Sequence, residues 1–238
     1  MEKISSLSIK LFADGADLEN MIEMSKFEYI SGLTTNPTLM RKAGVKSYTN
    51  FAKQVLSYIP HKPISFEVFT DDLDTMVVQG EQIAAWGENV YVKIPITNTK
   101  GESTDKVISK LTSKGVKVNV TAVMTEIQVR RILDSLNPEI ESNISVFAGR
   151  IADTGIDPLP IMQSCLQLIE GNDNLKLIWA SPRELLNVFQ ADSIGCHIIT
   201  ATTEILKKLE LVGYNLEQYS LDTVRMFHRD ATSAGYKI

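Results

Sequence analysis

The sequence predicts an α/β fold, a (β/α)8 or TIM barrel with an additional C-terminal helix. Three observations support this prediction. Short apolar runs rich in β-branched residues alternate with longer amphipathic stretches, the alternation occurs eight times, and no low-complexity segment or linker interrupts the 238 residues. Such alternation is typical of parallel strands covered by helices, and eight repeats favour closure into a barrel. We therefore expect residues 1–238 to form one barrel domain, with 215–238 as a helical arm.

Each predicted element follows from its own pattern of apolar residues. The predicted strands are residues 8–13, 29–33, 63–69, 89–95, 116–121, 143–148, 175–180 and 196–200. The helical segments between and after them are residues 17–26, 48–58, 73–86, 103–113, 126–135, 158–170, 182–190 and 203–209. Asp72, Ser103 and Thr125 are suitable helix N-caps. A doubly wound open sheet is the alternative, but no glycine-rich first turn supports it.

The segment 216–235 remains after the eighth helix. Leu216, Tyr219, Val224 and Phe227 recur near helical spacing. The sequence leaves two interpretations open for this segment. It is either a ninth helix packed on its own barrel or an arm that reaches a neighbouring subunit.

The composition narrows the possible functions. With 44% hydrophobic residues, 22% charged residues and a net charge of -5, the chain lacks the basic balance of a general nucleic-acid binder. No apolar run approaches the roughly 20 residues that cross a bilayer, and residues 1–6 lack the features of a signal peptide. Cys165 and Cys196 are expected to be core thiols in a reducing cytoplasm. The histidines and cysteines lack metal-ligand spacing, so we expect no metal site.

Lys93 is the most informative residue because it interrupts an apolar, β-branched run, 89–95. Burying an unpaired ammonium is costly, so a buried strand that carries one requires an explanation. One explanation is an amine kept partly neutral by desolvation, which can attack a carbonyl. The other is a lysine whose ammonium reaches water or pairs with a carboxylate. This segment alone does not decide between them.

Polar residues gather where the predicted strands end, which is where barrel active sites form. Taken singly, Asp14 is a possible helix cap, Glu67 a possible partner for a cation and Arg150 a possible salt-bridge residue. Together they exceed the number of desolvated polar groups that a core requires. The residues at or near the strand ends are Asp14, Thr35, Asn36, Glu67, Lys93, Asn119, Thr121, Ser145, Phe147, Arg150, Ser181 and Arg183.

Several of these residues lie in motifs that resemble the transaldolase family, in its short-chain branch with the fructose-6-phosphate aldolases. The matching segments occur in family order and span most of the chain. They are Leu11-Phe12-Ala13-Asp14, Gly32-Leu33-Thr34-Thr35-Asn36-Pro37, Phe66-Glu67-Val68, Val92-Lys93-Ile94-Pro95, Asn119-Val120-Thr121, Phe147-Ala148-Gly149-Arg150-Ile151 and Ala180-Ser181-Pro182-Arg183. The combination of Thr-Thr-Asn-Pro with Val-Lys-Ile-Pro is specific. The resemblance implies a Schiff-base enzyme without metal or cofactor, acting on sugar phosphates in the cytoplasm.

The resemblance also implies a role for each site residue. Lys93 would form the Schiff base, Asp14 would act as acid and base, and Glu67 with Thr121 would hold a catalytic water. The residues that would bind substrate are Thr35, Asn36, Asn119, Ser145 and Phe147 around the sugar, and Arg150, Ser181 and Arg183 around its phosphate. Short-chain members commonly form pentamers or decamers with the C-terminal helix on a neighbour, which would suit the segment 216–235. No nucleic-acid or membrane partner is implied.

Three residues resemble transaldolases more than fructose-6-phosphate aldolases: Glu67, Asn119 and Phe147. Two segments depart from the family pattern, residues 13–15 and residues 151–158. These departures flank Asp14 and the phosphate side, so they bear on the substrate more than on the chemistry. The alternatives are an aldolase that releases free dihydroxyacetone and a non-catalytic sugar-phosphate-binding barrel.

Overall fold

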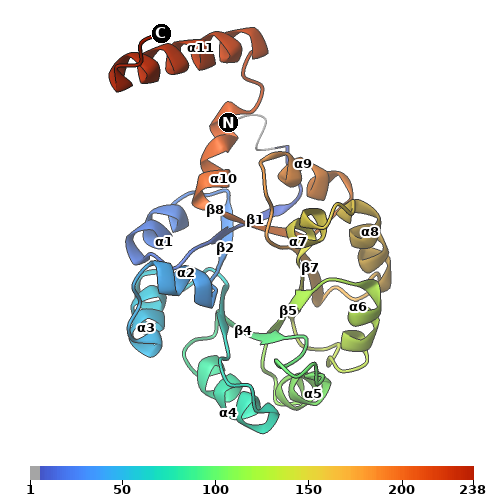
Figure 1. The fold of residues 1–238 in the computed structure, drawn as a ribbon. Coiled ribbons are helices and arrows are strands. Elements are labelled where there is room, and N and C mark those ends of the chain that lie inside the picture. Colours follow the sequence, from blue (N-terminus) through green and yellow to red (C-terminus); the bar gives the residue numbers. More distant parts are fainter. Residues whose placement is uncertain (1–5) are drawn as a thin grey trace.

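The computed structural model describes residues 6–238, and its eight parallel strands close into a barrel in which β1 pairs with both β2 and β8 (Figure 1). The strands are β1 (Lys10–Asp14), β2 (Ile30–Thr34), β3 (Ile64–Glu67), β4 (Val90–Pro95), β5 (Val118–Val123), β6 (Ser142–Val146), β7 (Leu175–Trp179) and β8 (Ile198–Thr202). Closure confirms the predicted barrel over the open sheet. The prediction about a signal peptide falls mainly on residues 1–5, which lie outside the described part.

Helices surround the barrel (Figure 1). They are α1 (Leu18–Ser25), α2 (Pro37–Lys42), α3 (Tyr48–Tyr58), α4 (Leu73–Ala84), α5 (Asp105–Ser113), α6 (Glu126–Leu133), α7 (Ala148–Asp153), α8 (Pro158–Leu168), α9 (Leu186–Ser193), α10 (Thr203–Lys207) and α11 (Leu216–Ala234), with a 3-10 turn η1 (Lys208–Leu211). The short helices α2 and α7 were not predicted. Asp72 and Thr125 cap α4 and α6 as expected. Ser103 does not cap α5, because the helix begins one residue later, after Thr104.

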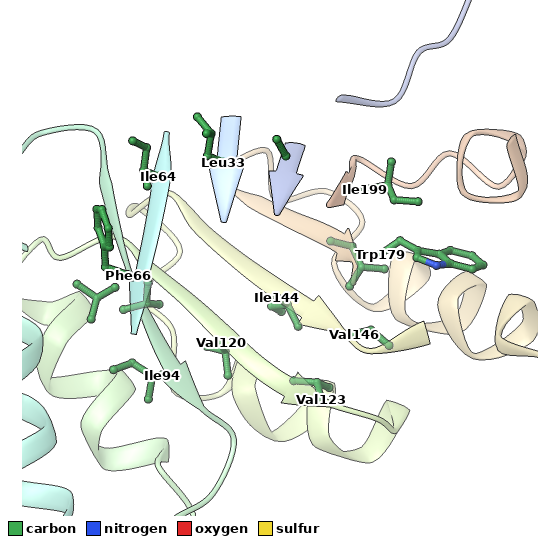
Figure 2. Close-up of a cluster of buried hydrophobic side chains, with 14 of the residues drawn as sticks. Leu33, Ile64, Phe66, Ile94, Val120, Val123, Ile144, Val146, Trp179 and Ile199 are labelled. Carbon is green, nitrogen blue, oxygen red and sulfur yellow. The ribbon is translucent and has the colours of Figure 1, made fainter. Parts of the chain in front are cut away.

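Successive side chains of a strand point alternately toward the helices and into the barrel, which separates the apolar core from the interior. On β3, Phe66 faces the helices and contacts the rings of Tyr48 and Trp86. Its neighbours Ser65 and Glu67 face the barrel interior, where they contact polar side chains of β4 and β5. Figure 2 shows buried apolar side chains along the strands that pack in the same layer as Phe66. The barrel interior is therefore divided between polar residues at the strand ends and a small apolar cluster formed by Phe12, Ile178, Ala180 and Ile198.

Two further predictions concern the cysteines and the C-terminal segment. Cys165 and Cys196 are free and buried, as expected. Burial raises the pKa of the Cys165 thiol to about 11 and that of Cys196 to about 12. The C-terminal segment forms α11, but none of its residues is buried, and Figure 1 shows it projecting away from the barrel. The interpretation in which this helix packs on its own barrel is therefore wrong.

Candidate active site

A cavity of about 380 Å³ opens at the carboxyl ends of the strands. The predicted residues that line it are Asp14, Asn36, Glu67, Lys93, Asn119, Thr121, Ser145, Phe147, Arg150 and Ser181. Thr35 and Arg183 lie beside it and do not contribute to its wall. A larger hollow, about 580 Å³, lies beside the other ends of β7 and β8. It contains none of the predicted residues, so the candidate active site is the cavity at the carboxyl ends.

Lys93 lies inside the barrel on β4 and is only 6% exposed. Its Nζ donates a hydrogen bond to the Thr35 carbonyl at 2.7 Å and lies 3.3 Å from Oε2 of Glu67. Adjacent registration places these two side chains together, since Glu67 on β3 pairs with Lys93 on β4. Burial shields the Lys93 side chain from most of the surrounding water. The amine therefore has one hydrogen-bond acceptor, the Thr35 carbonyl, and one neighbouring carboxylate, Glu67, that can receive a proton.

Asp14 ends β1 at the opposite wall of the cavity. Its carboxylate accepts hydrogen bonds from the Thr34 hydroxyl at 2.8 Å and from the Asn36 amide at 3.2 Å. Thr34 is itself within 2.5 Å of the Thr200 hydroxyl. Although Asp14 keeps some surface in the cavity, burial raises its pKa above the ordinary value of 3.8, more strongly than the charge of Lys93 lowers it. A carboxyl group tuned in this way is suited to both take up and return a proton.

The middle strands supply a polar network. The Asn119 amide donates to the Ser65 hydroxyl at 3.0 Å, and the Ser145 hydroxyl donates to the Asn119 oxygen at 2.7 Å. Thr121 differs, because its buried hydroxyl has no hydrogen-bond partner within the described residues. Other such buried atoms exist, but among the described residues only Thr121 also lines the cavity. Its hydroxyl is therefore a buried polar group beside the cavity whose hydrogen-bonding capacity is unused.

The two predicted phosphate-binding arginines are placed differently. Arg150 lines the cavity from α7. Arg183 is paired with Asp153, its Nε lying 2.9 Å from Oδ1 while Nη2 contacts Oδ2. This pair is about half exposed, and the guanidinium of Arg183 lowers the pKa of Asp153. A bound phosphate would need to compete with this carboxylate for part of the Arg183 fork.

Backbone geometry is unusual at two positions of the cavity wall. Ala122 and Ser181 both have a φ of 61°, a left-handed conformation that residues other than glycine rarely adopt. The Ser181 backbone also lies close to Gly149 on α7. A Cβ at Gly149 would lie 1.5 Å from the Ser181 carbonyl oxygen, so only glycine fits. Such local strain is frequent at functional sites.

Sequence reasoning missed several polar residues of this site. The Thr34 hydroxyl donates to the Asp14 carboxylate and is itself hydrogen-bonded to the Thr200 hydroxyl. The Ser65 hydroxyl accepts from the Asn119 amide. Each is a hydroxyl residue near a strand end, which is a signal too common to single out residues. Asp153, the partner of Arg183, was also missed. Within residues 6–238 no cluster of histidine, cysteine, aspartate and glutamate side chains is arranged to hold a metal ion, and no helix there is long and apolar enough to cross a bilayer.

Comparisons with known proteins agree with the resemblance seen in the sequence. Residues 11–238 match the family model of transaldolase/fructose-6-phosphate aldolase. A "probable transaldolase" of Sulfurihydrogenibium sp. (strain YO3AOP1) is 33% identical over 219 residues, covering 90% of this chain and 96% of that protein. A "probable transaldolase" of Thermoanaerobacter sp. (strain X514) is 31% identical over 231 residues, covering 97% of this chain and all of that protein.

Solved structures support the fold alone. KGPDC from Streptococcus mutans superimposes with a TM-score of 0.58 at 11% identity, covering 85% of this chain and 91% of that chain. A 2,3-dimethylmalate lyase superimposes with a TM-score of 0.53 at 13% identity, covering 99% of this chain and 87% of that chain. The match to the family model, together with the relatives at 33% and 31% identity, is decisive. The chain belongs to the transaldolase/fructose-6-phosphate aldolase family.

Proposed function

We propose that the protein is a Schiff-base transaldolase. It would transfer a dihydroxyacetone unit from a ketose phosphate, sedoheptulose 7-phosphate or fructose 6-phosphate, to an aldose phosphate. The observation that carries this proposal is the buried Lys93 amine, which lies beside Glu67 in a cavity that also contains a separate carboxyl group, Asp14, whose pKa burial raises. An amine nucleophile with a neighbouring base and a distinct acid is the arrangement that carbonyl chemistry through an imine requires.

The first half of the reaction would form the imine. Lys93 gives up a proton to Glu67, its Nζ attacks the C2 carbonyl of the ketose phosphate, and transfer of a proton from nitrogen to oxygen yields a carbinolamine. Glu67 lies 3.3 Å from the amine and, through a water held with the unpartnered Thr121 hydroxyl, would protonate the leaving hydroxyl. Loss of water gives an iminium ion that accepts electrons from the adjacent carbon–carbon bond.

The second half would break and remake a carbon–carbon bond. Asp14 removes the proton of the C4 hydroxyl, the C3–C4 bond breaks, and its electrons pass into the iminium to form an enamine on Lys93. The aldose phosphate leaves, an acceptor aldehyde enters, and the enamine carbon attacks it while Asp14 returns the proton. Hydrolysis of the new iminium then releases the product. Asp14 must therefore cycle between both protonation states, which its raised pKa favours.

The remaining wall residues would orient the substrate. Asn36, Asn119 and Ser145 present amide and hydroxyl groups to the dihydroxyacetone end of the cavity, with Thr35 holding the amine through its carbonyl. Phe147 would pack against the carbon chain. Arg150, Ser181 and Arg183 would bind the distal phosphate, for which the guanidinium fork is suited.

Borohydride trapping tests the proposal. The purified protein is mixed with fructose 6-phosphate, reduced, and searched for adducts by peptide mass spectrometry. We expect a dihydroxyacetone-sized adduct on Lys93 and none without the sugar. Free dihydroxyacetone released in the absence of acceptor would instead indicate the aldolase, and no adduct with either ketose phosphate on folded protein would favour a non-catalytic binding barrel.

Arg183 provides a prediction about phosphate binding. Arg183→Ala is expected to raise KM for sugar phosphates about 10- to 100-fold, as loss of a charge-assisted hydrogen bond would, with a small effect on kcat. Arg131→Ala is the matched control, because Arg131 forms a comparable surface pair with Asp105 outside the cavity. If steady-state kinetics show that both variants change KM equally, Arg183 does not bind phosphate.

The helix α11 supports a proposal about assembly, because its apolar side chains lie in water. Val224 is 60% exposed and Phe227 is 63% exposed. We propose that this face docks on a neighbouring copy in a homo-oligomer, a pentamer or decamer. Val224→Asp with Phe227→Asp is expected to yield a smaller species in sedimentation velocity, and Ile127→Asp, at an exposed position on α6, is the control. An unchanged sedimentation coefficient would contradict this role.

Location in the cytoplasm stays a prediction.

A further inference from the structure

Tyr48, on α3, makes an unusual contact with the backbone of a predicted catalytic residue. Its hydroxyl accepts a hydrogen bond from the Glu67 N–H at 2.6 Å and donates one to the Glu67 carbonyl at 3.0 Å. A phenol can fill both roles at once because its oxygen is both donor and acceptor. One side chain from outside the barrel thus satisfies both backbone groups of the residue that contacts Lys93.

This contact occurs where the ladder between β2 and β3 ends. The last rungs pair Leu33 with Ile64 and Thr34 with Ser65, and the Thr35 N–H then donates to the Ser65 carbonyl at 3.2 Å. In a parallel ladder the next bond would run from the Glu67 N–H to the Thr35 carbonyl. After Thr35 the chain turns away into α2, whose N-cap is Asn36.

The missing rung is replaced by two other hydrogen bonds. Tyr48 receives the Glu67 N–H, and the Thr35 carbonyl accepts from Nζ of Lys93 at 2.7 Å instead. The two bonds therefore depend on the same break in the ladder. If Glu67 donated to Thr35 as the ladder would continue, this carbonyl would be shared between the backbone and the amine.

The ring of Tyr48 is fixed by aromatic neighbours, which makes the hydroxyl a rigid support. Ring centroids lie 4.4 Å away for Phe69, 5.4 Å for Trp86 and 6.1 Å for Phe66. Burial also raises the pKa of the Tyr48 hydroxyl above its ordinary value of 10.0. The hydroxyl therefore keeps its proton and remains a donor at neutral pH.

We propose that Tyr48 is a positioning residue. It ends the β2–β3 ladder at Glu67, holds the Glu67 carboxylate beside Lys93, and leaves the Thr35 carbonyl free for the amine. This inference rests on the proposed function, because it assigns Tyr48 an effect on the proton transfers in which Glu67 takes part. It adds to the site a residue that touches neither the cavity nor the substrate.

Tyr48→Phe tests the role, because phenylalanine keeps the ring packing and removes only the hydroxyl. We expect kcat to fall about 10- to 100-fold, since small misplacements of catalytic groups have effects of this size, while KM changes less than about threefold. Tyr58→Phe is the matched control: Tyr58 lies on the same helix, is 64% exposed, and is expected to retain full activity. Wild-type kcat in Tyr48→Phe would overturn the proposal.

A double-mutant cycle separates positioning from general loosening of the fold. In a Glu67→Gln background the water-mediated proton transfer is already impaired, so adding Tyr48→Phe is expected to lower kcat less than about twofold further. If Tyr48→Phe lowers kcat by the same factor in the wild-type and Glu67→Gln backgrounds, Tyr48 does not act through Glu67. If Tyr48→Phe fails to fold, the test moves to Tyr48→4-aminophenylalanine, whose amine donates to the Glu67 carbonyl but accepts poorly from the Glu67 N–H. We expect kcat of this variant to fall about 10-fold, and wild-type kcat in a folded sample overturns the proposal.

Amide hydrogen exchange distinguishes failure of this inference from failure of the proposed function. Exchange at the Glu67 amide is expected to accelerate at least about tenfold in Tyr48→Phe, because its hydrogen-bond partner is gone, with no change in Tyr58→Phe. If the wild type neither turns over ketose phosphates nor forms an adduct, the proposed function fails, whatever the exchange result. Unchanged exchange at Glu67 in an active enzyme refutes the role of Tyr48 alone.

Discussion

Replacing Lys93 by alanine is expected to abolish turnover, with kcat lower by roughly 10⁴-fold or more. Every step of the proposed mechanism passes through a covalent bond to Nζ, and no other described lysine lines the cavity. Lys93→Met is expected to have the same effect, although it preserves most of the volume of the side chain. The measurement is steady-state turnover of ketose phosphate with an aldose phosphate acceptor, combined with borohydride trapping, which should yield no adduct.

Two controls make this result interpretable. Loss of the ammonium leaves Glu67 as a partly buried carboxylate without its cation, which destabilises the fold, so the melting temperature of each variant must be measured. Lys176→Ala removes another lysine of a barrel strand, on β7, whose side chain lines the pocket at the other mouth, and should retain turnover. Substantial activity in Lys93→Ala, or an adduct on another lysine, would refute the Schiff-base assignment.

Replacing Asp14 by asparagine is expected to slow carbon–carbon bond cleavage by about 10²- to 10⁴-fold, the usual contribution of general acid–base catalysis. Imine formation does not require the C4 hydroxyl proton, so Lys93 should still react. Borohydride is then expected to trap an adduct of the mass of the entire ketose phosphate in place of the three-carbon adduct. If Asp14→Asn yields the three-carbon adduct at the wild-type rate, another group removes that proton.

The same substitution should also change how the free energy of unfolding depends on pH. Burial raises the pKa of Asp14 above 3.8, so the folded state binds its proton more tightly than the unfolded state. Its contribution to stability is therefore fully present below about pH 3.8 and is lost as pH rises through the folded pKa. Asparagine has no such dependence. The free energy of unfolding of Asp14→Asn minus that of the wild type, measured in urea, is expected to increase from pH 4 to pH 7, and a constant difference would contradict this account.

The barrel could be predicted because each buried strand is a short apolar run in the sequence. The run at β4 is apolar except for Lys93, and the residues before the turns at β1 and β2 are polar. Strand ends on one side of a parallel barrel meet in space. The amino-acid pattern alone therefore places Asp14, Glu67 and Lys93 in one cavity, although they are far apart along the chain.

Other features depend on distances that a periodic pattern does not encode. The helices α2 and α7 are too short to show an amphipathic period. The left-handed Ser181 backbone lies close to Gly149, which belongs to another element. The pairing of Arg183 with Asp153 and the contact of Tyr48 with Glu67 likewise join elements that are distant in sequence. Their residue types are common on protein surfaces and in aromatic clusters, so no sequence signal separates them from their neighbours.

The contact between Gly149 and Ser181 has a consequence for directed evolution of this cavity. Every other amino acid begins with the Cβ that would lie 1.5 Å from the Ser181 carbonyl oxygen, so a library randomised at position 149 would consist almost entirely of damaged barrels. Leu39 and Phe147 also line the cavity, and both present side chains that can be shortened or exchanged. Libraries that aim at new acceptor aldehydes should therefore vary positions 39 and 147 and keep position 149 constant.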